Sequence, residues 1–167
     1  MTTYIVTRRC MTGVNEYRYY RGIEQIGKAT AFLLPDYPVT LQCTGLMLRY
    51  VNDPEITRVS GISRPVFDAD CGEEYARVYW DGTGRHRLYT PFGKFPIEYR
   101  DGAYAFGRGD VCIAGIRTIR KDSPFHPEWE AMKEDQWEPR MAMVTTERLP
   151  DELALLMLAF PLLQLAP

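Results

Sequence analysis

Hydrophobic and polar residues alternate in many short runs along the chain, and Gly, Pro, Asp and Asn separate these runs. Alternation with a period of two is typical of half-buried strands, and the runs are rich in the residues that favour strands. The pattern predicts strands at 4–7, 16–20, 27–34, 40–51, 55–62, 85–90, 95–99 and 139–146, and further strands within 66–80 and 103–120. Gly45 indicates a bulge or a bend within the long run 40–51. Short strands with regular turn signals predict a sandwich or a barrel.

Three segments repeat one local pattern, in which an aromatic strand leads through a Gly-containing turn into a strand of small and branched residues. They are residues 17–32, 66–80 and 104–119. In the middle segment, Asp68 and Asp70 precede Gly72, and Asp and Gly in this order favour a tight turn. The pattern predicts one hairpin after another, as in a β-meander.

The last segment, LPDELALLMLAFPLLQLAP (149–167), is the most apolar part of the chain. Leu, Ala and Met favour a helix, and Asp151 and Glu152 suit its first turn. A membrane anchor, a helix that docks on a partner or exchanges between chains, and a buried core helix are the alternatives. The run is shorter than the about 20 residues that span a bilayer, and it has no polar face. We therefore expect a core helix formed by Leu153, Leu155, Leu156, Met157, Leu158 and Phe160. Pro161 is expected to kink or end this helix, with an extended apolar segment after it.

A helix that is apolar on all sides needs strands all around it, and only a closed sheet provides them. The sequence therefore predicts a mainly β protein, a closed antiparallel β-barrel of about twelve strands around a central hydrophobic C-terminal helix. The 167 residues suit one domain, 1–167.

The net charge of −2 argues against a dedicated nucleic-acid-binding protein. The four cysteines, at positions 10, 43, 71 and 112, are widely spaced and form no CxxC pair. With no signal peptide at the N-terminus, this predicts reduced thiols in a cytoplasmic protein. Cys43 and Cys112 lie inside predicted strands and are expected to be buried, whereas Cys71, beside Gly72, is expected to be exposed.

The chain has no GxSxG, HExxH, P-loop or GxGxxG motif, and it has only two histidines, His86 and His126. The carboxylates at positions 68, 70, 73 and 74 do not match a twelve-residue calcium loop, so a turn is the better interpretation. The sequence thus points to no catalytic residue, no metal site and no cofactor.

Three segments in order resemble the tubby C-terminal-like family, closest to its LURP-one-related and phospholipid-scramblase-like members. They are a strand, Asp-Gly turn and branched strand at 66–78, a late hairpin at 104–121, and a last strand leading into an apolar helix at 141–162. The resemblance implies a twelve-stranded barrel around a helix, and phosphoinositide binding by basic groups on the barrel surface. The chain lacks the cysteine cluster and the free membrane segment of the scramblase-like members, so scramblase activity does not carry over. No binding residue of the family can be assigned to a position in this chain.

Basic residues are the candidate ligand-binding groups, because guanidinium groups bind phosphates well. One candidate set is Arg85, His86 and Arg87, between two predicted strands, and the other is Arg108, Arg117, Arg120 and Lys121. Consecutive residues of a strand face opposite sides of the sheet, so Arg117 is expected on the outer face if Ile116 faces the interior. The alternative for each set is an ordinary solvated surface.

We expect a non-enzymatic binding or adaptor module that recognises anionic phospholipid or phosphoinositide headgroups, or a protein partner, through its outer surface. Such a protein is cytoplasmic, with peripheral membrane association as an option and no transmembrane segment. The alternative is a small-molecule-binding or enzymatic barrel that uses its mouth and the aromatic, acidic loop 121–139.

Overall fold

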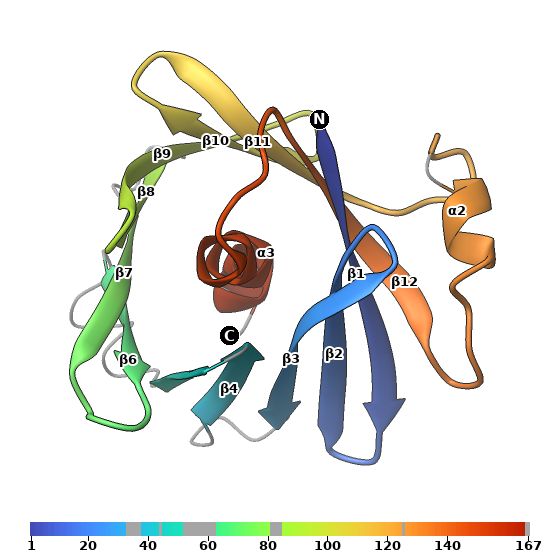
Figure 1. Cartoon of the computed structure of the whole chain (residues 1–167), viewed down its shortest axis with the longest axis horizontal. Helices are drawn as coiled ribbons and strands as arrows, with labels where there is room; N and C mark the ends of the chain where they lie inside the picture. The colour runs from blue at the N-terminus through green and yellow to red at the C-terminus, as the bar shows by residue number, and fades with distance from the viewer. Residues whose placement is uncertain (33–37, 44, 52–62, 81–84, 125, 166–167) are drawn as a thin grey trace.

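Within the described residues, twelve antiparallel strands form the fold, with one helix after the last strand and a short helix before it (Figure 1). The computed structural model describes residues 1–32, 38–43, 45–51, 63–80, 85–124 and 126–165. The strands are β1 (Thr2–Met11), β2 (Val14–Arg21), β3 (Glu24–Phe32), β4 (Pro38–Cys43), β5 (Leu46–Val51), β6 (Ser63–Asp68), β7 (Glu74–Trp80), β8 (Arg85–Thr90), β9 (Gly93–Arg100), β10 (Ala103–Arg108), β11 (Val111–Thr118) and β12 (Glu138–Thr145). The helices among the described residues are α2 (His126–Glu130) and α3 (Asp151–Leu165).

The sheet closes because the first strand, β1, pairs with the last strand, β12, and all other pairs join strands that are consecutive in the sequence. The closing pair runs in register from Thr2 opposite Thr145, with a bulge after Val6. A mainly β protein with a closed antiparallel barrel of twelve strands, as the sequence predicts, is therefore confirmed. All three repeated segments are hairpins, namely β2–β3, β6–β7 and β10–β11.

The prediction of a single strand at 40–51 is wrong, because the run folds into the β4–β5 hairpin. Gly45 has a φ of +75°, which turns the chain back instead of bending one strand. The predicted strand at 55–62 lies outside the described residues. The described chain resumes with β6, which begins at Ser63.

Helix α3 follows β12, and its ribbon lies inside the ring of strands (Figure 1). Its residues 153–159 are all buried, with side chains at most 1% exposed, and they belong to the same hydrophobic cluster as residues from the strands. Strand members of this cluster include Tyr19, Leu41, Leu88, Phe106 and Met143. Among the expected helix residues, Leu153, Leu155, Leu156, Met157 and Leu158 are buried, and the side chain of Phe160 lies outside what is described.

Pro161 does not end the helix, which continues to Leu165, so the predicted extended segment after it is wrong. A proline in a helix costs one backbone hydrogen bond and crowds the preceding turn, and a helix can accommodate this by bending. No helix within the described ranges has the length and apolarity needed to cross a membrane.

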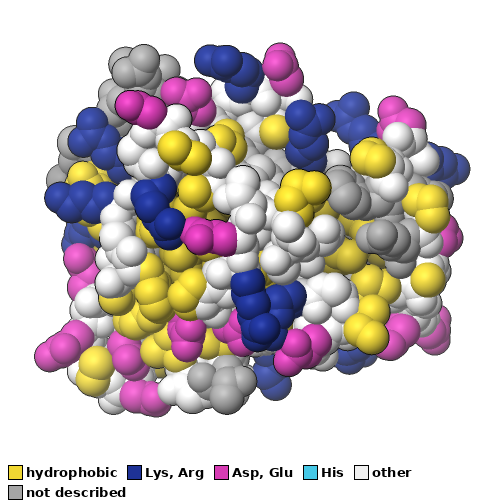
Figure 2. All heavy atoms as spheres, turned by 45° about the horizontal axis from the view of Figure 1, so that its top comes forward, with side chains coloured by type: hydrophobic (Ala, Val, Ile, Leu, Met, Phe, Trp, Pro, Cys, Tyr) yellow, Lys and Arg dark blue, Asp and Glu magenta, His cyan; other side chains and the backbone are white. Residues whose placement is uncertain are grey.

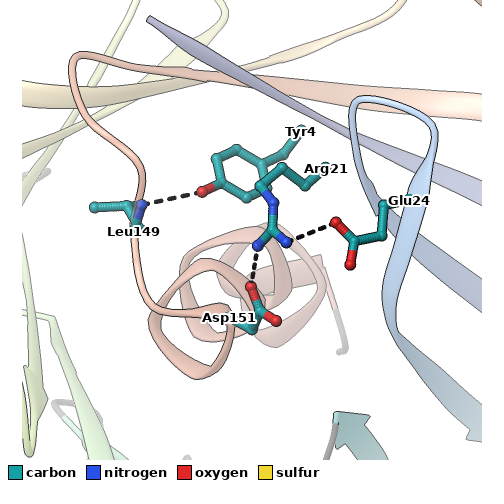
Figure 3. Close-up of polar contacts among 5 residues, drawn as sticks. All are labelled: Tyr4, Arg21, Glu24, Leu149 and Asp151. Atoms are coloured by element: carbon teal, nitrogen blue, oxygen red, sulfur yellow. Dashed lines mark hydrogen bonds and ion pairs between the residues drawn. The ribbon is translucent and has the colours of Figure 1, made fainter.

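Polar contacts join the start of α3 to the strands around it (Figure 3). The guanidinium group of Arg21, at the end of β2, donates to a carboxylate oxygen of Asp151 and to Glu24 Oε2 at 2.7 Å. The backbone N–H of Leu149 donates to the phenol oxygen of Tyr4 at 3.1 Å. Burial lowers the pKa of Arg21, but the hydrogen bond to Glu24 and the charge of Asp151 outweigh it, so the pKa lies above its ordinary value.

Residues between β11 and β12 pack on the outside of the barrel, where Figure 1 places α2. Trp129 of α2 is 1% exposed and packs with Ile5 and Ala142, which face outward from β1 and β12. Trp137 is also buried, and two guanidinium groups lie over its ring, that of Arg18 at 3.9 Å and that of Arg9 at 4.8 Å from the ring centroid. This part of loop 121–139 is an aromatic cover on the barrel wall.

Candidate functional site

A groove of about 590 Å³ lies on the outer surface of β11 and β12, next to the β9–β10 turn. It is lined by Tyr99, Asp101, Gly102, Gly115, Arg117, Thr118, Ile119, Arg120, Asp122, Ser123, Pro124, Ala142 and Val144. Its size falls within the range of about 300–1,000 Å³ that is usual for ligand pockets. We call it the outer groove.

Small outward-facing residues form the floor of the outer groove. Gly115 alternates with the buried residues Ala114 and Ile116, so it faces outward, and its partner in register on β12 is Val144. A Cβ atom added at Gly115 would have only one neighbour within 4 Å, the backbone oxygen of Tyr104 at 4.0 Å. The floor is therefore open because no side chain rises from its centre.

One wall of the groove is the segment that leaves β11. Its first residue, Ile119, is fixed by a backbone hydrogen bond from its N–H to the carbonyl of Arg140 at 2.9 Å. The following turn closes with the Ser123 N–H donating to the Arg120 carbonyl at 2.9 Å. Ile119 also packs against the Trp129 cluster, which ties this wall to the barrel.

Two guanidinium groups, of Arg117 and Arg120, line the groove, and neither forms an ion pair within the described parts of the chain. The exposed Lys121 follows directly. Arg100 also lies close by, because Ala103 of β10 pairs with Arg100 on one side and with Arg117 on the other. Its only ion pair among the described residues is a loose contact of 3.8 Å with Glu98. Basic groups from β9, β11 and the segment after β11 thus gather at one place.

The β9–β10 turn forms the opposite side of the groove. Asp101 and Gly102 have φ angles of +53° and +77°, the left-handed pair typical of a tight two-residue hairpin turn. Tyr99, at the end of β9, is exposed, and its ring centroid lies 4.8 Å from that of Tyr104. Burial, with a smaller contribution from Tyr99, raises the pKa of Tyr104 above its ordinary value.

Figure 2 turns the upper side of Figure 1 towards the viewer and shows the charge pattern of that side. Basic and acidic side chains are interspersed there, with hydrophobic side chains between them, and neither charge dominates. The groove itself has the same mixture, since Asp101 and Asp122 line it together with Arg117 and Arg120.

The structure does not bring the first predicted basic set together. Arg85, His86 and Arg87 are the first residues of β8, within the predicted strand 85–90, and do not form a loop between two strands. His86 is half-buried and shares the inward-facing side with Leu88, whereas Arg87 is exposed on the other face. The side chain of Arg85 is outside the description. The alternation of strand side chains therefore separates His86 from Arg87.

Arg108, of the second predicted set, does not line the groove. It lies at the opposite end of β10 from Ala103 and forms an ion pair with Glu147 at 2.8 Å. Within this set, Arg117 and Arg120 line the groove and Lys121 lies beside it. Sequence reasoning missed Tyr99, Arg100 and Asp101. The hairpin sequence EYRDGAY (98–104) contains them, and its in-register partner strand β11 carries Arg117.

The carboxylates near Gly72 form the turn that the sequence predicts. The N–H of Asp70 donates to the Asp68 side chain at 2.9 Å, and the N–H of Gly72 donates to the Asp68 carbonyl at 2.8 Å. Asp68 thus stabilises the turn with its side chain and its backbone.

All four cysteines are free, and Cys43 is buried while Cys71 is exposed, as expected. The expectation for Cys112 is wrong, because this residue lies at the exposed start of β11. Burial, followed by the negative charges of Glu152 and Asp151, raises the pKa of the Cys43 thiol to about 11. Such a thiol is a poor nucleophile at neutral pH.

Comparison of the chain with protein-family models, with curated proteins and with solved structures gives no match.

Proposed function

We propose that this chain is a non-enzymatic binding module of tubby C-terminal-like type, which binds an anionic phospholipid headgroup in the outer groove. The observation that carries the proposal is the pair of guanidinium groups in that groove, those of Arg117 and Arg120. Neither has an ion-pair partner within the described residues, so an incoming phosphate displaces no internal carboxylate.

A guanidinium group suits a phosphate because its planar fork donates two parallel hydrogen bonds. Arg100 and Lys121 lie next to the groove and add positive charge without lining it. Each such group near an anionic membrane contributes about 1 kcal/mol, and salt weakens this contribution. We therefore expect binding of modest affinity that decreases as the salt concentration rises.

The packing inside the barrel favours a binding site on its outer surface. In this proposal α3 is a central hydrophobic helix that fills the barrel. In support, its residues 153–159 are at most 1% exposed and pack with inward-facing strand residues. Around residues 153–159 the interior is therefore occupied by side chains of the helix and the strands. This favours a surface binding module over an enzyme or carrier that uses the barrel mouth.

Vesicle flotation tests the proposal. The wild-type protein is expected to float with phosphatidylcholine vesicles that contain phosphatidylglycerol or a phosphoinositide, and not with phosphatidylcholine alone. The double variant Arg117→Ala/Arg120→Ala is expected to lose this binding, because it lacks both groove guanidinium groups. Arg87→Ala is the matched control, since Arg87 is an exposed strand arginine on β8, away from the groove.

Two results would contradict the proposal. One is the absence of flotation with anionic vesicles at low salt, and the other is equal binding by the double variant and by wild type.

A further inference from the structure

The outer groove is lined by groups of both charges, and they do not neutralise one another directly. Arg117, Arg120, Asp101 and Asp122 all line it. Within the described residues, no guanidinium nitrogen of this set lies within the 4.0 Å ion-pair distance of either carboxylate. The groove thus presents separate positive and negative positions around one space.

The local structure explains why the charges stay apart. Asp101 is held at the β9–β10 turn by its left-handed backbone, while Arg117 belongs to β11 and pairs with Ala103. Arg120 and Asp122 share one turn, whose closing hydrogen bond joins the Ser123 N–H to the Arg120 carbonyl. Each position is fixed by backbone hydrogen bonds and not by attraction between the four side chains.

This arrangement discriminates between ligands by their charge pattern. A headgroup with negative charge alone is attracted by the two arginines but repelled by the two carboxylates. A headgroup that carries a protonated amine as well as its phosphate can satisfy both sets of groups. Charge complementarity therefore favours a headgroup that carries both a negative and a positive charge.

We propose that the outer groove recognises the headgroup of an aminophospholipid. Arg117 and Arg120 hold the phosphate, and Asp101 and Asp122 receive the ammonium group. The inference rests on the proposed function, because it adds an amine requirement to the same lipid-binding groove.

Two anionic lipids of equal net charge provide the test. Phosphatidylserine and phosphatidylglycerol attract a basic surface equally, but only phosphatidylserine carries an ammonium group. The wild-type protein is expected to bind phosphatidylserine vesicles about two- to fivefold more tightly than phosphatidylglycerol vesicles. This is the factor that exposed charge pairs of up to about 1 kcal/mol provide.

The variant Asp101→Asn/Asp122→Asn is expected to lose this preference and to bind phosphatidylglycerol at least as well as wild type. Asparagine tolerates the left-handed backbone at position 101, so the turn is kept. Asp110→Asn is the matched control, because it removes the same charge from an exposed hairpin turn at the other end of β10 and β11. This control is expected to retain the preference.

The outcomes separate the two proposals. Equal binding of both lipids by wild type, lost in Arg117→Ala/Arg120→Ala, would overturn the amine requirement and leave the anion site intact. A preference that persists in Asp101→Asn/Asp122→Asn would also overturn it. Binding of neither lipid would overturn both proposals.

Discussion

Gly27 on β3 and Leu155 on α3 lie so close together that position 27 has no room for a side chain. A Cβ atom added there would lie 2.8 Å from Leu155 Cδ2 and 2.7 Å from the backbone oxygen of Gln42. The backbone of α3 comes closest to β3 and β4, so the missing side chain lets the helix approach this part of the wall. Packing inside the barrel therefore depends on a glycine in a strand.

Gly27→Ala is expected to destabilise the protein by about 1–3 kcal/mol, because the extra methyl group must push away a backbone oxygen and a buried leucine. Thermal unfolding should shift down by roughly 2–4 °C for each kcal/mol lost. Gly115→Ala is the control, since its new Cβ would meet nothing closer than 4.0 Å. Equal melting temperatures for Gly27→Ala and wild type would contradict the dependence of this packing on a glycine at position 27.

Arg21→Ala is expected to destabilise the protein, because Arg21 is the group that joins the first turn of α3 to the end of β2. The side chain of Arg21 is only 11% exposed, so its loss leaves Asp151 without its partner in a half-buried place. The expected cost is about 1–3 kcal/mol in a denaturant titration. Arg100→Ala, which removes an arginine that is 79% exposed, should change the unfolding midpoint little. Equal effects of the two substitutions would contradict a special role for the Arg21 contact.

Much of the fold can be predicted because strand and turn signals are local. The Asp68–Gly72 turn and the outward position of Arg117 both follow from residues within a few positions. Local signals also explain the error at Gly45, because a glycine within an apolar run is equally consistent with a bulge and with a full turn.

The candidate site was less accessible to sequence reasoning, because it depends on which strand residues lie side by side. Arg85 and Arg87 flank His86 in the sequence. Alternation along β8 nevertheless places the side chains of His86 and Arg87 on opposite faces of the sheet. Asp101 and Arg117 are sixteen positions apart, yet the register of β10 with β11 brings both to the outer groove. The register between strands is set by the whole barrel, so it cannot be predicted from a local sequence pattern.

The four thiols are expected to differ in reactivity. Cys10, Cys71 and Cys112 are exposed and should react quickly with a thiol reagent under native conditions, whereas Cys43 should react only after unfolding. Counting thiols with and without denaturant checks this, and Cys43→Ala should remove only the slow fraction. Rapid reaction of all four thiols would contradict the burial of Cys43.

The Cys43 thiol also makes the free energy of unfolding depend on pH in the alkaline range. The pKa of Cys43 is raised from 9.0 to about 11, so the folded state holds the proton more tightly than the unfolded state. This contribution to stability is fully present below pH 9.0 and is lost as the pH rises towards about 11. The decrease in unfolding free energy over that window should be smaller in Cys43→Ala than in wild type.

A chain that ends at Pro150 is expected not to fold. It lacks residues 153–159, whose four leucines and one methionine are buried. Each such side chain contributes roughly 1.5–3 kcal/mol, so their combined loss is comparable to the whole stability of an ordinary domain, about 5–15 kcal/mol. Circular dichroism and dispersion of amide signals in NMR spectra measure the outcome. A folded, monomeric truncated chain would contradict the proposed role of α3 as the filling of the barrel.

The most direct test of the proposed function is vesicle binding by Gly115→Leu. A leucine at this position extends from the groove floor into open space, so it should fill the groove and leave Arg117, Arg120 and the fold intact. Gln42→Leu is the matched control, because it adds a leucine at an exposed position on β4, five strands away around the barrel. If headgroups bind in the groove, Gly115→Leu should retain the melting temperature of wild type but bind anionic vesicles as weakly as Arg117→Ala/Arg120→Ala. Full vesicle binding by a correctly folded Gly115→Leu protein would contradict the outer groove as the binding site.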